Sequence, residues 1–82
     1  MIREILAKNI IIYRNRLGYS QEDLSGACGA LEEADALSNR SFISDIENCR
    51  RNITLDKIEI LAKALQVEPY QLFLTKDIGE KI

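Results

Sequence analysis

The chain has 82 residues, of which 46% are hydrophobic and 29% are charged, and its net charge is −2. This length allows one small domain, whose core isoleucine and leucine must supply because tryptophan is absent and aromatics are scarce. The chain has no run of about 18 apolar residues and carries charges near its N-terminus, so we expect neither a membrane span nor a secretory signal. We therefore expect a cytoplasmic protein.

Cysteine and histidine usage bears on metal sites and catalysis. Cys28 and Cys49 form no CxxC pair, and the chain has no histidine to complete a zinc site. We interpret both as reduced thiols, with a disulfide or a redox switch as the alternative. No nucleophile has an evident base, so the sequence predicts neither an enzyme nor a bound metal or cofactor.

Negative charge is concentrated in one segment. Residues 30–38 contain Glu32, Glu33 and Asp35 and no cation, so this segment contributes −3. Because the whole chain carries −2, the remaining residues carry +1. Affinity for nucleic acid depends on where positive charge lies relative to the phosphates, so the acidic total does not exclude DNA binding.

The first part of the chain predicts two helices. In residues 2–16 apolar side chains recur every three or four positions, the period of an amphipathic helix, and Gly18 suits its C-terminal end. Ser20 then begins Ser-Gln-Glu-Asp, a hydroxyl N-cap with an acidic residue three positions on. This second helix has one apolar face, and Gly29 is a suitable end.

The second part predicts three more helices. Asn39 is a good N-cap for a third helix, whose inward-facing side chains are Phe42, Ile43 and Ile46. Thr54 caps a fourth helix with a continuous apolar face. Pro69 suits the first position of a fifth helix.

An acidic connection joins the second and third predicted helices. Residues 30–38 favour helix and either extend the second helix or form a separate helical turn. Residues 75–82 form a C-terminal tail, whose apolar residues at intervals of four suit docking on a partner. We predict an all-α fold, a compact bundle of five short helices in one domain spanning residues 1–82, with its core in residues 5–74.

Three ordered blocks of the sequence resemble the Xre family of helix-turn-helix regulators, whose fold is lambda-repressor-like. The blocks are Tyr-Arg-Asn-Arg-Leu-Gly-Tyr-Ser-Gln-Glu-Asp-Leu at 13–24, Phe-Ile-Ser-Asp-Ile-Glu at 42–47, and Arg-Arg-Asn-Ile-Thr-Leu-Asp-Lys-Ile-Glu-Ile-Leu-Ala-Lys-Ala-Leu at 50–65. The Arg-Asn-Ile-Thr-Leu stretch is also similar to the controller proteins of restriction-modification systems. The resemblance implies a DNA-binding domain in which residues 40–47 form the recognition helix.

The resemblance implies that four side chains of this helix face base edges, namely Arg40, Ser41, Ser44 and Asp45. Arg40 suits bidentate contact with a guanine, because its guanidinium fork matches the two acceptors on that base. The two serines are less discriminating, because a hydroxyl pairs with several bases. Asp45 either accepts a hydrogen bond from a cytosine amine or holds Arg40 in position.

A second set of residues is implied to contact phosphates. Gln21 opens the second helix, where its side chain and the N-terminal amides would meet a phosphate. The others lie at the start of the recognition helix and in the turn after it, and are Asn39, Asn48, Arg50, Arg51 and Asn52. The alternative for Arg50 and Arg51 is a solvated helix end that complements the helix dipole. Arg14 and Glu47 match an ion pair of the family that ties the recognition helix to the first helix and does not read bases.

The chain departs from the family at two places. About eight residues are added between Gly29 and Phe42, and since negative charge near DNA repels phosphates, they project outward, bind a protein partner or help dimerisation. Cys49 stands where the family often has glycine after the recognition helix. Because a left-handed backbone is costly for cysteine, we expect Asn48 to adopt it instead.

The sequence thus predicts a transcription regulator that binds double-stranded DNA, acting as a homodimer on a palindromic operator. An autoregulatory controller of a restriction-modification operon and an antitoxin-like autorepressor are the two subtypes. The alternative is a protein–protein interaction module on the same fold that uses the acidic segment. Loss of DNA affinity with rising salt distinguishes a DNA reader from that module.

Overall fold

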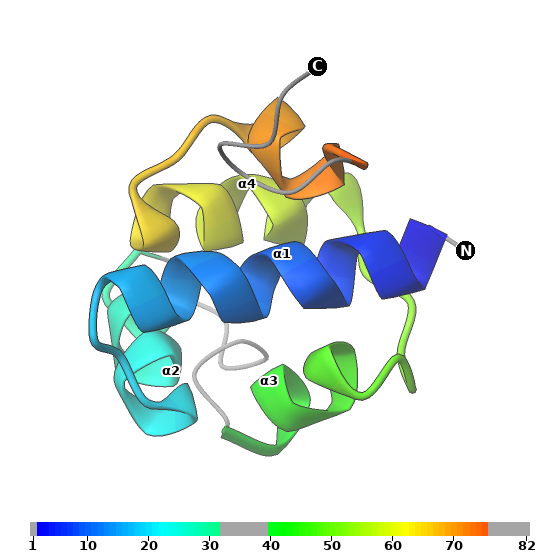
Figure 1. Ribbon diagram of the computed structural model, residues 1–82. Coiled ribbons are helices and arrows are strands. Elements are labelled where there is room, and N and C mark those ends of the chain that lie inside the picture. Colours follow the sequence, from blue (N-terminus) through cyan, green and yellow to red (C-terminus); the bar gives the residue numbers. More distant parts are fainter. Residues whose placement is uncertain (1, 32–39, 76–82) are drawn as a thin grey trace.

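The computed structural model describes residues 2–31 and 40–75, which form four α-helices and one 3-10 helix (Figure 1). These are α1 (Ile2–Arg16), α2 (Gln21–Gly29), α3 (Arg40–Glu47), α4 (Leu55–Leu65) and the 3-10 helix η1 (Pro69–Phe73). The two described ranges contain no strand, and the all-α prediction is confirmed. Asn39, most of the acidic segment and most of the C-terminal tail lie outside the described residues, as do the predictions made for them.

The predicted count of five α-helices is wrong by one. Pro69 begins a helix as predicted, but η1 is a 3-10 helix of five residues that ends at Phe73. Its start is closed locally, because the backbone N–H of Glu68 donates to the Gln71 side chain at 2.9 Å. The hydrogen bonds of a 3-10 helix join residues three apart, and proteins use this tighter helix in short segments such as this one.

The two predicted hydroxyl caps are confirmed. Ser20 Oγ accepts from the backbone N–H of Asp23 at 3.0 Å, and the Asp23 carboxylate accepts from the N–H of Ser20 at 2.9 Å. This reciprocal capping box fixes the first turn of α2. Thr54 Oγ1 accepts from the N–H of Lys57 at 3.3 Å and begins α4 in the same way.

Both α1 and α4 are followed by a residue with left-handed backbone conformation. Gly18 has φ of +73° after α1, as expected of its position, and Gln66 has φ of +63° after α4. In each case the next residue returns its N–H to the last turn, Tyr19 to Arg14 and Val67 to Ala62, both at 3.0 Å. These bonds satisfy carbonyls that the helix leaves unpaired and turn the chain sharply.

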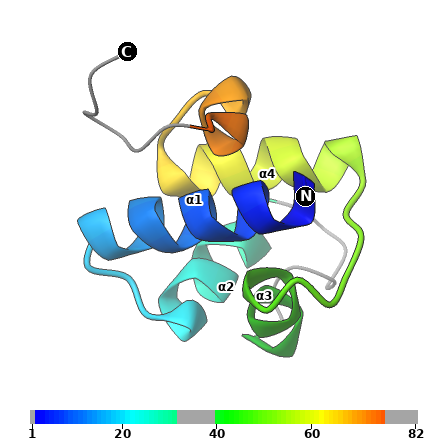
Figure 2. The ribbon, with the colours of Figure 1, turned by 45° about the vertical axis from the view of Figure 1, so that its right-hand side comes forward.

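The helices pack around α1, which crosses the middle of the molecule (Figure 1). α4 and η1 lie on one side of α1, and α2 and α3 lie together on the other side, as the turned view of Figure 2 also shows. α1 contacts α3, α4 and η1, while α2 contacts α3 and α4. Every helix therefore contributes to one interior.

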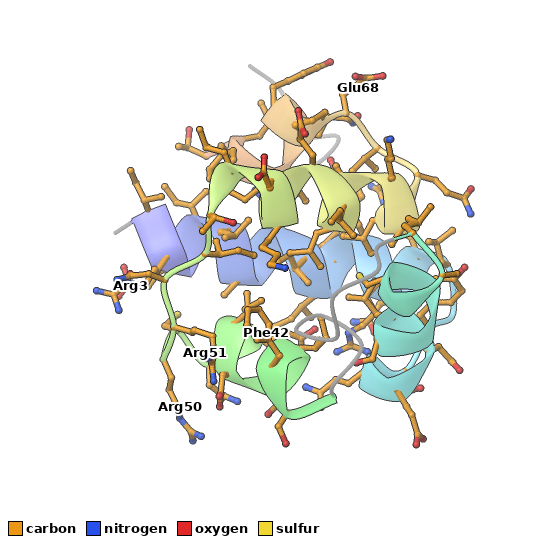
Figure 3. All side chains as sticks on the ribbon, turned by 180° about the vertical axis from the view of Figure 1, so that it is seen from behind. Arg3, Phe42, Arg50, Arg51 and Glu68 are labelled. Carbon is orange, nitrogen blue, oxygen red and sulfur yellow. The ribbon has the colours of Figure 1, made fainter. Side chains whose placement is uncertain are left out.

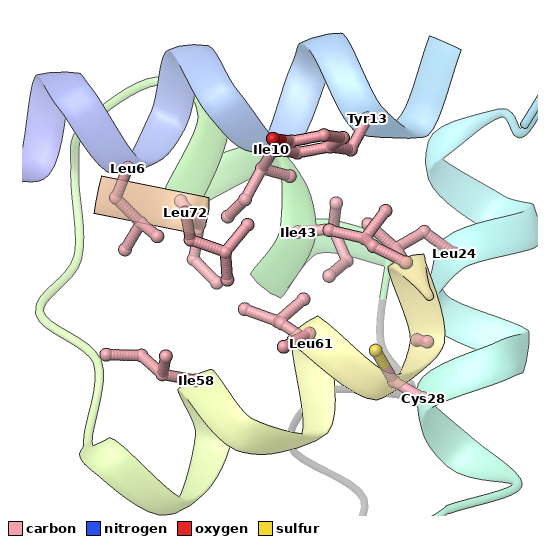
Figure 4. Close-up of a cluster of buried hydrophobic side chains, with 13 residues drawn as sticks. Leu6, Ile10, Tyr13, Leu24, Cys28, Ile43, Ile58, Leu61 and Leu72 are labelled. Atoms are coloured by element: carbon pink, nitrogen blue, oxygen red, sulfur yellow. The ribbon is translucent and has the colours of Figure 1, made fainter. Parts of the chain in front are cut away.

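The core is mainly aliphatic, as the composition requires, and it also includes the buried ring of Tyr13 (Figure 4). Its fully buried members come from all five elements and include Ile10, Leu24, Cys28, Ile43, Leu61, Leu65 and Leu72. Burial of Ile43 and Ile46 on α3 confirms the predicted inward face, while Phe42 packs at the edge of the core. Removing these side chains from water supplies the main driving force for folding.

One buried polar residue joins α1 to the end of η1. Asn9 is 2% exposed, and its side-chain amide donates to the carbonyl of Leu72 at 2.8 Å and to that of Leu74 at 3.0 Å. Both amide hydrogens are therefore used, and one carbonyl in the last turn of η1 and one just after η1 are satisfied. These two bonds add to the burial of Leu72 in holding η1 on α1.

None of the described helices combines the length and the apolar character that crossing a membrane requires.

Candidate nucleic-acid interface

A partly buried charged network sets the position of α3 relative to α1 and α2. Arg14 Nε donates to Glu47 Oε2 at 2.7 Å and Arg14 Nη2 donates to Glu47 Oε1 at 3.1 Å, so the pair is bidentate. The two side chains are only 14% and 5% exposed. A third nitrogen of Arg14 donates to the carbonyl of Tyr19 at 2.8 Å, which adds the turn before α2. The pair predicted from the resemblance thus joins three segments.

Gln21 takes part in the same network. Its side-chain Nε2 donates to Glu47 Oε1 at 2.9 Å, which links the first turn of α2 to the last turn of α3. An amide nitrogen has two hydrogens, so one remains for the predicted phosphate. Glu22 and Asp23 lie in the same helical turn and repel a phosphate. Phosphate binding by Gln21 stays a prediction.

The outer face of α3 forms one polar hollow with its neighbours. Ser41, Ser44 and Asp45 line this hollow together with Gln21 from α2 and Arg50 from the following turn. Three of the four predicted base readers are thereby brought together beside two predicted phosphate ligands. Arg40 opens α3, but its side chain, like Asn39, lies outside the described part of the chain. Its contact with a guanine stays a prediction.

The turn after α3 differs from the prediction in one residue. The left-handed residue is Cys49, with φ of +62°, and not Asn48. Cys49 N–H donates to the carbonyl of Ile46 at 3.1 Å and Arg50 N–H donates to that of Asp45 at 2.8 Å, the two bonds of a Schellman motif. The helical bonds run one residue further than expected, since Asn48 N–H still reaches the carbonyl of Ser44 at 3.0 Å.

Asn48 uses its side chain within α3. Its Nδ2 donates to the carbonyl of Ser44 at 2.8 Å and lies 3.4 Å from the Ser44 hydroxyl. Asn48 therefore supports the last turn of α3 and orients one predicted reader. Phosphate binding by Asn48 stays a prediction.

Asp45 is paired with the two arginines of the turn. Asp45 Oδ2 accepts from Arg51 Nη2 at 3.2 Å, and Asp45 Oδ1 lies 3.7 Å from Arg50 Nη1. The guanidinium of Arg51 also lies over the Phe42 ring, 4.5 Å from its centroid (Figure 3). Two cations beside one carboxylate leave this part of the surface with positive charge.

Arg3 is a candidate phosphate ligand that sequence reasoning missed. It is exposed near the start of α1, and it lines a surface groove together with the predicted ligand Asn52. Its carbonyl lies 3.8 Å from Cys49 Sγ, so α1 begins directly beside the turn after α3. Arg3, Arg50 and Arg51 extend along the same edge of the molecule in Figure 3. No local pattern links residues this distant in sequence.

These features define a class of domain: a small helical bundle in which two consecutive helices, fixed by a buried ion pair, present a polar face. Comparison with known proteins gives the same class. The Helix-turn-helix family matches residues 10–72. The chain therefore belongs to this family, of the Xre type, a family of DNA-binding transcription regulators and not of enzymes. The resemblance predicted from the sequence is confirmed.

Individual relatives agree with this assignment. The chain is 40% identical over 73 residues to a Neisseria hypothetical transcription factor from Neisseria meningitidis serogroup B, covering 89% of this chain and 61% of the relative. It thus spans about three fifths of that relative's length. It is 42% identical to control protein C.SmaI from Serratia marcescens over 78% of this chain and 67% of the relative. It is also 42% identical to control protein C.BamHI from Bacillus amyloliquefaciens, over 73% of this chain and 64% of the relative.

A solved structure supports the fold. The crystal structure of the hypothetical transcription factor NHTF from Neisseria matches with a TM-score of 0.78 and 39% identity, covering 90% of this chain and 76% of that chain.

Proposed function

We propose that this protein is a sequence-specific regulator of transcription that binds a roughly palindromic operator as a homodimer, with one α3 helix per half-site. The observation that carries the proposal is the Arg14–Glu47 pair and its bond to Gln21, because it holds α3 rigidly on α1 and α2. The outer face of α3, with the hollow lined by Ser41, Ser44 and Asp45, is then in position to enter a DNA groove.

The similarity to control proteins supports a narrower proposal. We infer that the protein controls its own operon, of the restriction-modification kind, with a toxin–antitoxin operon as the alternative. In either setting the concentration of the protein sets the occupancy of its operator.

The homodimer is supported by apolar side chains on α4 and η1. Leu55 is 78% exposed and Tyr70 is 66% exposed, and both line one shallow depression together with Ile58 and Phe73. Exposed apolar side chains gathered in this way are typical of protein contacts. α4 and η1 lie across α1 from α3 (Figure 1), so a second copy bound here leaves both α3 helices free for DNA.

Selection from a random duplex library with the purified protein tests the proposal. We expect a motif of two inverted half-sites whose centres are about one helical turn, ~34 Å, apart or a multiple of that distance. Affinity for the selected duplex should fall steeply as salt rises, because the arginines displace counterions from phosphates. Enrichment of no motif contradicts sequence-specific reading. A flat salt dependence favours a protein-interaction module instead.

Arg40 gives the sharpest single substitution on the selected site. Arg40→Ala should weaken binding by about 1–3 kcal/mol and relax preference at one base pair, because a bidentate guanine contact is lost. The measurement is a titration of the selected duplex and of its single-base-pair variants. An equal loss on every duplex would make Arg40 a phosphate ligand and not a reader.

A further inference from the structure

The contacts of Arg51 connect a predicted phosphate ligand to a predicted base reader. Arg51 lies in the turn after α3, yet its guanidinium reaches back over that helix to Phe42 and Asp45. Phe42 and Asp45 are three residues apart on α3, so their side chains are neighbours on one helical face. Arg51 therefore spans this pair of neighbours.

Each partner of Arg51 restricts a different freedom of the guanidinium. The Phe42 ring, 4.5 Å away, provides an apolar surface and a favourable quadrupole on which the group rests. The Asp45 carboxylate accepts from one edge of the group at 3.2 Å. A planar guanidinium can satisfy both contacts together, whereas an ammonium is a compact point charge that satisfies one.

The contact with Arg51 both orients the Asp45 carboxylate and offsets its negative charge. Its side chain is 27% exposed in the polar hollow. An unpaired carboxylate there would be repelled by phosphates, and Arg51 offsets that charge. Arg51 binds Oδ2, whereas Oδ1 lies 3.7 Å from Arg50 Nη1, beyond hydrogen-bond distance, so the directional contact on this carboxylate is the one from Arg51. A carboxylate oxygen is the acceptor that a cytosine N4 amine requires.

We propose that Arg51 is a specificity-determining residue that acts through Asp45, holding the carboxylate so that it reads a base. This inference rests on the proposed function and deepens it. Arg51 thus contributes to the choice of sequence as well as to affinity, although no atom of it touches a base. Arg50 differs, because it lies 3.7 Å from Asp45, is 69% exposed and has no ring beneath it among the described contacts.

The test compares Arg51→Lys with Asp45→Asn on the duplex selected by the wild-type protein and on its single-base-pair variants. Asp45→Asn should lose discrimination at one base pair by about fivefold or more. Arg51→Lys keeps the charge but not the fork, so its affinity for unrelated DNA and its salt slope should stay within about twofold of wild type. Its discrimination should fall at that same base pair, by about threefold or more.

Two further variants complete the test. Asp45→Asn combined with Arg51→Lys should lose no more discrimination than Asp45→Asn alone, because the two residues act as one unit. Arg16→Lys is the matched control, because Arg16 is an exposed arginine of α1 whose guanidinium also lies over an aromatic ring, that of Tyr13 at 5.6 Å, and this variant should leave discrimination unchanged. Full discrimination in Arg51→Lys, equal loss at every base pair, or independent losses in the double variant would each overturn the proposal. A wild-type protein that discriminates nowhere would instead overturn the proposed function, and this inference with it.

Discussion

Cys49 has a backbone conformation that its side chain disfavours. At φ of +62° the Cβ atom crowds the following carbonyl, which costs an L-residue about 1–2 kcal/mol relative to glycine. The Schellman bonds of Cys49 and Arg50 to the last turn of α3 impose this conformation. In return the thiol gains a contact of 3.8 Å with the carbonyl of Arg3. The conformation is needed to turn the chain from α3 toward α4.

Cys49→Gly should therefore stabilise the protein by about 0.5–1 kcal/mol, since relief of the steric cost outweighs the added flexibility of the unfolded chain. Urea unfolding followed by circular dichroism measures the change. Cys49→Ala is the control, because alanine keeps the Cβ and should not be more stable than the wild type. Equal stability of the glycine and alanine variants would mean that the turn carries no strain.

At the scale of the elements, the Arg14–Glu47 pair joins α3 to α1 and to the start of α2. The Arg14 guanidinium donates three hydrogen bonds. The Glu47 carboxylate accepts from Arg14 on α1 and from Gln21 on α2. A pair this buried need not stabilise more than apolar residues of the same size would. What it supplies is a defined orientation of α3, because each bond has a required direction.

Glu47→Ala should destabilise the protein by about 3 kcal/mol or more, because the Arg14 charge is left buried without its partner. Thermal or urea unfolding measures this loss. The matched control is Glu59→Ala on the exposed side of α4, which should change the unfolding free energy by less than about 0.5 kcal/mol. Similar small losses in both variants would show that Glu47 is not essential to the bundle.

The elements that could be predicted from the sequence are those with local patterns. The Ser20 and Thr54 caps, the glycine after α1 and the apolar period of α4 each depend on residues within a few positions, and all were found where expected. The nature of η1 and the conformation of Cys49 depend on hydrogen bonds that only the folded helix ends define. The contacts of Arg51 likewise need the turn to fold back over α3.

At the scale of the whole molecule, positive charge collects at one edge although the chain is acidic. Arg50 and Arg51 follow α3, and packing of α1 against that turn brings Arg3 to the same edge (Figure 3). Such a cluster attracts phosphates even when the total charge is negative, because the field near a surface follows the local charges. Arg3 is therefore a candidate to contact phosphates beside those that Arg50 and Arg51 are predicted to contact.

Arg3→Gln should weaken binding to all duplexes alike and reduce the slope of log affinity against log salt by about 1, because one phosphate contact is lost. Titrations at several salt concentrations measure the slope. Lys63→Gln removes the same charge from the exposed side of α4 and should leave the slope unchanged. If both variants alter the slope equally, the effect comes from net charge and not from a contact at Arg3.

In the proposed homodimer, the surface of α4 and η1 joins the two copies that would bind a palindrome. Leu55 is the most exposed large apolar side chain among the described residues, so it has little to stabilise in a single copy of the chain. Leu55→Glu should therefore leave the unfolding of the monomer almost unchanged and weaken self-association at least tenfold, since a carboxylate would be buried opposite its own copy. Sedimentation velocity across a range of concentrations measures the association.

The same variant links assembly to DNA reading. A monomer still carries one intact α3, so Leu55→Glu should keep its preference for a single half-site and lose the added affinity of the paired site, because the second contact is no longer intramolecular. Leu31→Glu places the same change on an exposed leucine outside the α4–η1 depression, and it should dimerise like the wild type. A Leu55→Glu protein that remains dimeric would place the dimer contact elsewhere on the molecule.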